Sequence, residues 1–336
     1  MAAAGGENLE KLEDMIVRAA EATAAHVRAA KAAIGAVIFG QDKVIDHALI
    51  TVLSGGHGLL VGVPGLAKTK LVDTMGTALG LDARRIQFTP DLMPSDILGS
   101  EVLEEGAGGK RNFRFIPGPV FAQLLMADEI NRASPRTQSA LLQAMQEQHV
   151  TVAGARHDLP KPFHVLATQN PLEQEGTYPL PEAQLDRFLM EIDVDYPDQE
   201  AERKILFDTT GAEEGRVKQA MTADELMQAQ RLVRRLPVGE SVVAAILALV
   251  RSARPGPDAG EIGKLISWGP GPRASQALML LVRARALLDG RLAPSIDDVV
   301  ELAEPVLKHR MALTFAARAE GETVTNVIGR LKARIG

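Results

Sequence analysis

The chain has 336 residues, of which 46% are hydrophobic, 24% charged and 4% aromatic, and this balance excludes wholesale disorder while leaving room for two or three domains. The formal net charge of -6 argues against general binding of nucleic acid, because phosphate contacts need clustered Lys and Arg. The absence of cysteine excludes a disulfide framework and cysteine-ligated zinc.

The first part of the chain alternates between helical and strand-like segments. Apolar residues recur at helical spacing over residues 7–34 and again over residues 44–53, so a helix is predicted in each. Further helices are expected at residues 68–79 and 135–147, and short apolar runs predict strands at residues 58–61, 85–88, 122–127, 164–168 and 189–194. Alternation of this kind predicts an α/β fold, a parallel sheet with helices on both faces.

Two insertions and a second domain complete the predicted organisation. Residues 99–119 are rich in Gly and charge and are expected to form a hairpin or loop, and residues 149–162 a β-hairpin that turns at Gly154. From residue 198 onward the patterns are helical with short Pro and Gly breaks, which predicts a smaller, all-helical domain. The expected division is a helical extension over residues 1–36, a core over residues 37–197 and the helical domain over residues 198–336.

A candidate phosphate-binding loop lies between the predicted strand that ends at Val61 and the helix that follows. Backbone N–H groups in such a turn converge on phosphate oxygens, and the helix N-terminus favours negative charge. Lys68 would neutralise the outer phosphates and the Thr69 hydroxyl would help to hold Mg²⁺. Ala67 stands where the strict motif has a second glycine, so the backbone must be one that Ala can adopt. The predicted contacts are Gly62, Val63, Pro64, Gly65, Leu66, Ala67, Lys68, Thr69 and Lys70; the competing interpretation is an ordinary Gly/Pro turn.

Two adjacent carboxylates end a later apolar run. Asp128 and Glu129 follow residues 124–127, and at the C-terminal edge of a parallel sheet they would face a ligand. Asp128 is expected to hold the Mg²⁺ water shell, and Glu129 to activate the attacking water as general base. Because Asp-Glu pairs are common, a solvated turn is the alternative interpretation.

Polar and arginine side chains further along are candidates for contact with the γ-phosphate. Asn170, at the end of the next predicted strand, is suited to orient the attacking water, and the alternative interpretation is a turn residue before a proline. Arg187, on a predicted short helix over residues 181–188, is a candidate arginine finger supplied to a neighbouring subunit, with a local salt bridge as the alternative. Arg132 and Arg136 are rival phosphate sensors that the sequence does not rank.

Arg273 begins a predicted helix of the second domain. It is a candidate to reach the γ-phosphate and to couple nucleotide state to domain angle, and the alternative is a surface arginine. Other chemistry finds little support: the seven histidines show no metal-ligand spacing, and His47 and His57 are expected on a helix surface or in a loop. No nucleophile–His–acid signature is present.

The sequence gives no sign of membrane insertion or export. No apolar run approaches the roughly 20 residues that a membrane span needs. The first residues lack a basic segment followed by an apolar core, so no signal peptide is predicted. We therefore expect a cytoplasmic protein.

Taken together, these segments resemble the MoxR family of AAA+ ATPases. The resemblance extends roughly from Val37 to Arg273, and the motifs are specific as a set. The matching segments are Val37–Gln41, Gly62–Thr69, Phe88–Gly99, Asp128–Ala133, Ala167–Pro171 and Leu180–Phe188. This similarity implies an AAA+ P-loop core with a parallel sheet flanked by helices, followed by a smaller all-helical lid domain.

The resemblance also implies roles that spacing alone does not provide. Val37, Ile38, Gly40 and Gln41 would line the adenine pocket, and ATP and Mg²⁺ would be the cofactors. Asn170 matches sensor 1, Arg187 the arginine finger and Arg273 sensor 2, which acts either on its own nucleotide or on that of a neighbour. Both hairpins would face the channel of a homo-oligomer, typically a hexameric ring.

The expected function is Mg-dependent ATP hydrolysis that drives chaperone-like remodelling or maturation of a partner protein. Family members often act on proteins with von Willebrand A domains; no Asp-x-Ser-x-Ser metal motif occurs here, so such a domain would lie on another chain. Hydrolysis would rock the C-terminal domain against the core. Two alternatives stay open: an ATP-gated assembly adaptor with little turnover, and a DNA motor whose channel would use Lys110, Arg111 and Arg114.

Overall fold

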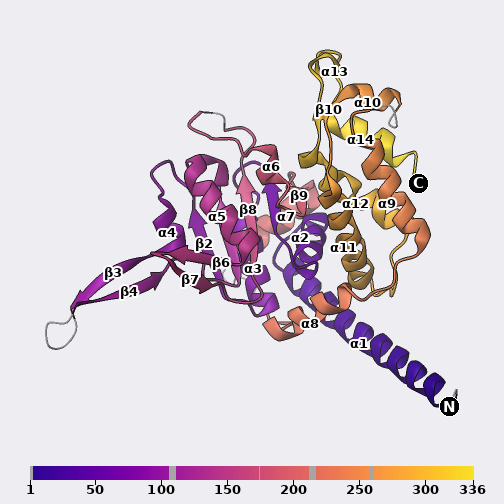
Figure 1. Ribbon diagram of the computed structural model, residues 1–336, viewed down its shortest axis with the longest axis horizontal. Helices are drawn as coiled ribbons and strands as arrows, with labels where there is room; N and C mark the ends of the chain where they lie inside the picture. The colour runs from indigo at the N-terminus through magenta and orange to yellow at the C-terminus, as the bar shows by residue number, and fades with distance from the viewer. Residues whose placement is uncertain (1–2, 106–110, 174, 212–216, 257–259) are drawn as a thin grey trace.

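A computed structural model describes residues 3–105, 111–173, 175–211, 217–256 and 260–336, with residues 3–16 described by their backbone alone (Figure 1). Its centre is a five-stranded sheet whose strands all run in parallel. In spatial order the strands are β2 (Ala83–Gln87), β5 (Leu124–Asp128), β8 (His164–Gln169), β1 (Gly58–Val61) and β9 (Met190–Asp193). This confirms the predicted parallel sheet.

The strand order places β1 where the direction of winding reverses. The chain leaves β1 for the far edge at β2, returns through β5 and β8, and then crosses β1 to reach β9. All five residues of β5 are buried, as expected for a strand covered on both faces. The carboxyl ends of β1, β5 and β8 lie on one edge, where open α/β sheets bind ligands.

Two helices of the first part of the chain, at residues 68–79 and 135–147, have the predicted bounds, whereas the first two begin earlier than predicted and the one near residue 182 is shorter. The helices of this part are α1 (Ala3–Gly35), α2 (Asp42–Leu53), α3 (Lys68–Leu79), α4 (Pro94–Leu98), η1 (Ile130–Arg132), α5 (Pro135–Glu147), α6 (Glu182–Leu185) and α7 (Gln199–Thr209). The prediction that Arg187 lies on a helix is wrong, because α6 ends at Leu185 and Arg187 lies in the link to β9. Phe188, which is fully buried, draws this link into the core.

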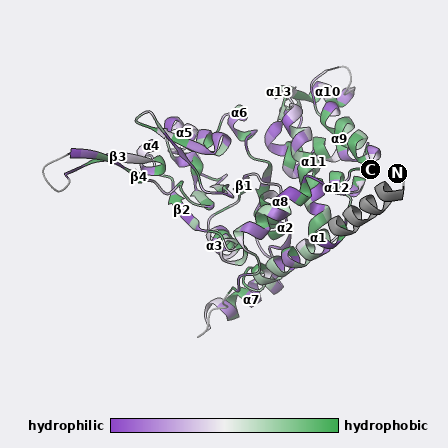
Figure 2. Ribbon diagram, turned by 60° about the horizontal axis from the view of Figure 1, so that its bottom comes forward, coloured by the Kyte–Doolittle hydropathy of each residue, from purple (hydrophilic) through white to green (hydrophobic). Residues whose placement is uncertain are grey.

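The long helix α1 runs along one side of the molecule (Figure 2). Its second half is not a free extension, because Ala24, Val27, Ala30 and Ile34 are all buried. It packs against α2, α3 and, further along the chain, α11. Among the described residues, no helix, α1 included, is both long and apolar enough to cross a membrane.

Two antiparallel hairpins leave the body of the core, as predicted. The longer one pairs β3 (Gly99–Glu105) with β4 (Arg111–Pro117) and projects far from the sheet (Figure 1). The shorter one pairs β6 (His149–Val152) with β7 (Ala155–Asp158). Phe115 stacks on His157 with ring centroids 3.8 Å apart, so the two hairpins are joined at their bases.

The C-terminal part is mostly helical but contains a small sheet. Ile266–Trp268 (β10) pairs in antiparallel fashion with Ala312–Leu313 (β11), so the all-helical expectation is wrong at this point. Strands of two or three residues are too short to show an alternating pattern in the sequence. The helices are α8 (Ala223–Val233), α9 (Glu240–Ser252), α10 (Glu261–Leu265), α11 (Pro272–Leu288), α12 (Ile296–Leu307), η3 (Lys308–Arg310), α13 (Phe315–Ala319) and α14 (Val324–Lys332).

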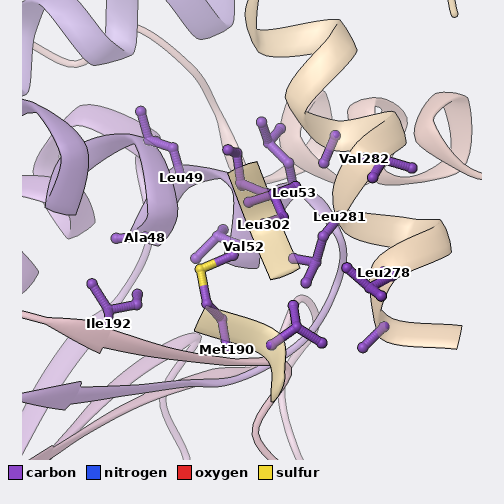
Figure 3. Packing of buried hydrophobic residues seen from close by; sticks show 14 of the residues in the cluster. Ala48, Leu49, Val52, Leu53, Met190, Ile192, Leu278, Leu281, Val282 and Leu302 are labelled. Carbon is purple, nitrogen blue, oxygen red and sulfur yellow. The ribbon is translucent and has the colours of Figure 1, made fainter. Parts of the chain in front are cut away.

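One apolar cluster joins this lid to the core. Leu53 of α2 and Met190 of β9 are buried against Leu281 of α11 and Leu302 of α12 (Figure 3). At the edge of this interface Arg285 Nη1 lies 3.3 Å from Asp46 Oδ2, so an ion pair also links α11 to α2. The core and the lid therefore share their hydrophobic interior.

The expected surface position is wrong for His47, whereas His57 lies in a loop, as expected, but is buried. His47 faces inward on α2 and is 3% exposed, and burial lowers its pKa to about 4. His57, just before β1, accepts a hydrogen bond from the Val165 N–H through Nδ1 at 2.9 Å. Burial lowers the pKa of His57 to about 3, so the ring stays neutral and can accept this hydrogen bond beside the sheet.

Truncation of the shared interior should destabilise the whole chain. We expect Leu281→Ala to lower the free energy of unfolding by about 2–5 kcal/mol, because it leaves a cavity between α11 and α2. Urea unfolding followed by circular dichroism measures this, and Leu247→Ala, at a side chain that is 48% exposed, should change it by less than about 0.5 kcal/mol. Separate transitions for core and lid, with the core unaffected, would contradict a shared interior.

Candidate nucleotide-binding and hydrolysis site

The predicted phosphate loop lies between β1 and α3, as expected. Its backbone is open to a ligand, because Pro64, Gly65 and Ala67 are exposed. Gly62 is required where the loop leaves the sheet, since a Cβ there would collide with the Val194 carbonyl. Gly65 has a φ of 88°, a conformation that favours glycine.

Ala67 adopts the backbone that the strict motif reserves for glycine. Its φ is 55° and its ψ is 22°, in the left-handed region, immediately before the first residue of α3. This conformation costs a residue with a Cβ about 1–2 kcal/mol. The loop therefore keeps the glycine geometry although the glycine is absent.

Lys68 folds back over the loop. Its Nζ donates to the Gly62 carbonyl and, at 3.1 Å, to the Val63 carbonyl. Burial lowers the pKa of Lys68, and the nearby carboxylates of Asp128 and Glu129 oppose that shift. The lysine and both carboxylates thus act on one another across the same edge of the sheet. Thr69, Lys70 and the loop residue Leu66 are half-buried.

A polar cavity of about 380 Å³ adjoins the segment predicted to hold adenine. Ile38 and Gly40 line it on one side and the first turn of α7, including Ala201, on the other. Gln41 does not line the cavity; its Nε2 donates to the Asp195 carbonyl at 2.8 Å and so links this segment to the chain that precedes α7. Val37 is half-buried and is not among the lining residues.

Asp128 ends β5 with its carboxylate already oriented by two neighbours. Thr168 donates from Oγ1 to Asp128 Oδ1 at 2.6 Å, and Arg85 Nη2 donates to Oδ2 at 2.6 Å. The Asp128 carboxylate and the Thr69 hydroxyl are the hard oxygen donors that Mg²⁺ prefers alongside nucleotide phosphates. The residues present therefore fit the predicted metal.

Glu129 turns out of the strand in a left-handed conformation, with φ at 55°. Its backbone N–H donates to Thr168 Oγ1 at 2.8 Å. Its carboxylate accepts from Gln87 Nε2 at 2.7 Å and from Arg132 Nη1 at 2.9 Å. The side chain is thus held toward β2, and Arg132, a predicted rival phosphate sensor, is engaged by Glu129 itself.

Asn170 follows β8 on the same edge and is 6% exposed. Its Oδ1 accepts a hydrogen bond from the Leu172 N–H at 3.1 Å, so the turn that the sequence allowed is present. This bond commits Oδ1 to the turn, so the NH₂ is the part of the amide group that could donate to a ligand.

Arg187 and Arg273 come together, but beside the amino ends of the strands, opposite the ends that carry the phosphate loop. They line a cavity of about 230 Å³ with His57, which directly precedes β1, and with Asp186. The pKa of Arg187 is lowered by burial and next by the charge of Arg273. Five residue steps separate His57 from Gly62 along β1, which is roughly 16 Å at the rise of a strand.

The structure also identifies neighbours that the sequence reasoning missed. Arg85, Gln87 and Thr168 contact the two carboxylates, and the exposed polar positions of the edge strand β2 were the available signal.

Of the candidates for a DNA channel, Arg114 pairs with Glu104 at 2.9 Å, and Lys110 lies outside the described residues. Arg136 is exposed in the first turn of α5.

The strain at Ala67 can be measured. We expect Ala67→Gly to raise the free energy of unfolding by about 1 kcal/mol and to preserve nucleotide binding, because glycine adopts φ of 55° without a Cβ clash. The matched change Ala78→Gly, inside α3, should lower it by about 1 kcal/mol or more. Chemical denaturation without nucleotide gives both values, and a loss of stability in Ala67→Gly would contradict the strained geometry.

Comparisons with known proteins identify the family of the chain. Residues 57–190 match the ATPase family associated with various cellular activities (AAA), and residues 261–331 match an AAA lid domain. Chaperone MoxR1 of Mycobacterium tuberculosis is 40% identical over 97% of this chain and 87% of its own length. Protein MoxR of Paracoccus denitrificans is 33% identical over 89% of this chain and 92% of its own.

A solved structure supports the fold along nearly the whole chain. A protein of Cytophaga hutchinsonii that is assigned as an ATPase superposes with a TM-score of 0.86 at 36% identity, covering 96% of this chain and 97% of the other. The chain belongs to the MoxR family of AAA+ ATPases.

Proposed function

We propose that the protein hydrolyses ATP in the presence of Mg²⁺ and uses the free energy to remodel or mature a partner protein. The observation that carries the proposal is the meeting of the phosphate loop, Asp128, Glu129 and Asn170 at one edge of the sheet. The partner is expected on another chain, and one with a von Willebrand A domain is the first candidate. We also propose a cytoplasmic location.

In this proposal the reaction needs positioning and charge stabilisation but no covalent intermediate. The Lys68 ammonium would leave the Gly62 and Val63 carbonyls for phosphate oxygens, which are stronger acceptors. Glu129 would accept a proton from the attacking water, and the Asn170 amide would orient that water. Bound Mg²⁺ would be held by Thr69 and Asp128 and would neutralise charge on the phosphates.

The two edges of the sheet favour an active site shared between subunits. Arg187 and Arg273 line a cavity beside His57, and His57 lies roughly 16 Å along β1 from Gly62 of their own phosphate loop, so we propose that neither arginine serves the γ-phosphate of its own chain. A neighbouring copy would bring both arginines to the open phosphate loop. We therefore propose a homo-oligomer, a hexameric ring, in which both arginines act in trans.

The shared interior changes the expected power stroke. A lid that rocked against its own core would have to separate Leu281 and Leu302 from Leu53 and expose apolar surface to water. We propose instead that core and lid turn together as one body relative to the next subunit. The hairpins, joined through Phe115 and His157, would move with them.

Removal of the proposed general base gives the first test. Glu129→Gln should bind ATP as tightly as the parent protein and lose turnover by about 10²- to 10⁴-fold, because the amide does not accept a proton from water. A fluorescent nucleotide measures binding and phosphate release measures turnover, with the exposed Glu240→Gln as control. Normal turnover in Glu129→Gln would contradict the assignment of Glu129 as general base. If the parent protein binds ATP and assembles but shows no turnover, the ATP-gated adaptor is favoured instead.

Mixing two inactive variants tests the shared site. Arg187→Ala should lose about 10³-fold or more in turnover while it still binds ATP. A mixture of Arg187→Ala with Glu129→Gln should recover activity, because the intact Glu129 of one chain meets the intact Arg187 of the other. Turnover per chain should also rise with protein concentration as the oligomer forms. A mixture that stays inactive, or a concentration-independent monomeric ATPase, would overturn the trans arrangement.

A further inference from the structure

The lid places a fully buried arginine against the segment that carries Arg187. Arg310, in η3, is 1% exposed. Its Nε donates to Asp186 Oδ1 at 2.7 Å, its Nη2 to the Phe188 carbonyl at 2.6 Å and its Nη1 to the Leu189 carbonyl at 3.2 Å. A single guanidinium from the lid thus contacts the residues on both sides of Arg187.

The neighbours of Arg310 in η3 hold the same stretch of the core. His309 donates a hydrogen bond from Nε2 to the Phe188 carbonyl at 3.1 Å. Lys308 Nζ lies 2.7 Å from Asp193 Oδ1 and 3.5 Å from Glu191 Oε1 in β9. Three consecutive lid residues therefore fix the chain from Asp186 into β9.

The second arginine of the cavity is tied to the same carboxylate. Asp186 Oδ1 pairs with Arg310, while Asp186 Oδ2 lies 3.8 Å from Arg273 Nη1. Arg187 itself donates from Nη1 to the Leu142 carbonyl of α5. Asp186 thus stands between a buried arginine that fixes it and an arginine that is half exposed at the cavity.

We infer that Arg310 is a positioning residue through which the lid sets the place of Arg187 and Arg273 at the subunit boundary. The inference rests on the proposed action of these two arginines on the nucleotide of a neighbouring copy. Arg310 would touch neither nucleotide nor substrate. Loss of the Arg310 contacts would release the Asp186–Leu189 segment from η3 and move the two arginines away from the position at which they meet the next subunit.

The chemistry of Arg310 favours this role over simple packing. Charged groups are costly to bury, and apolar side chains of similar volume hold core elements together at least as well. Several donors of Arg310 are spent on Asp186, Phe188 and Leu189 of one short segment, and its Nη1 is also 2.6 Å from the Val306 carbonyl within the lid. The planar fork of a guanidinium reaches such divergent acceptors at once, and a lysine nitrogen does not.

The test uses Arg310→Met and the conservative Arg310→Lys in the full-length oligomer. Arg310→Met should lower turnover at saturating ATP about 10²-fold, the effect expected when a catalytic group is displaced by roughly 1 Å, and should leave the dissociation constant of a fluorescent ATP analogue within about 2-fold. Arg310→Lys should fall between Arg310→Met and the parent protein. Mixed with Glu129→Gln, both variants should recover turnover, because the Glu129→Gln chains supply well-placed arginines.

The matched control removes a different ion pair between lid and core. Arg285→Met breaks the contact with Asp46 but leaves the Asp186–Leu189 segment untouched, so its turnover should stay within about 2-fold of the parent. If Arg310→Met fails to assemble, Arg310→Lys decides the question by the same mixing assay.

The outcomes separate this inference from the function on which it rests. Parent-like turnover in Arg310→Lys and Arg310→Met would overturn the positioning role. A second result would also overturn it: Glu129→Gln restores turnover when mixed with Arg187→Ala but not when mixed with the Arg310 variants. The defect of the Arg310 variants would then lie in their own phosphate site. If Glu129→Gln fails to repair Arg187→Ala as well, the trans arrangement itself is wrong, and the inference falls with it.

Discussion

The parallel direction of all five strands is the constraint on which the rest of the structure depends. It gathers the carboxyl ends of β1, β5 and β8, and with them the phosphate loop, Asp128 and Asn170, at one edge. The same constraint puts the link before β9 at the opposite edge. The backbone of a residue in that link, such as Arg187, therefore lies at the opposite ends of the strands from the phosphate loop of its own chain.

The buried interface between core and lid has a second consequence. The lid helices α11 and α12 pack on α2 and β9. The lid therefore lies next to β9, the strand that directly follows the link carrying Arg187. Arg273, at the start of α11, is thereby brought beside Arg187 rather than beside the phosphate loop of its own chain. The pairing of two arginines from distant parts of the chain thus follows from how the lid is attached.

Much of the core was predictable because its signals are local. The phosphate loop is a run of eight residues in which Lys68 follows the preceding strand at a fixed spacing. The apolar run before Asp128 predicts a buried strand. Burial of His47 and His57 was not predictable, since it depends on what packs against them. Arg310 gave no signal either, because its partners at Asp186–Leu189 are more than 120 positions away and a lone arginine forms no pattern.

Thr168 explains how the two carboxylates keep different orientations in adjacent positions. A hydroxyl has one proton to donate, and here it goes to Asp128 Oδ1, so the oxygen is left to accept the Glu129 N–H. That second bond helps to hold Glu129 in a left-handed conformation that would otherwise cost about 1–2 kcal/mol. The backbone turn then aims the Glu129 side chain at Gln87 and Arg132, while Asp128 stays in line with β5. One hydroxyl on a neighbouring strand therefore separates the proposed metal-binding group from the proposed general base.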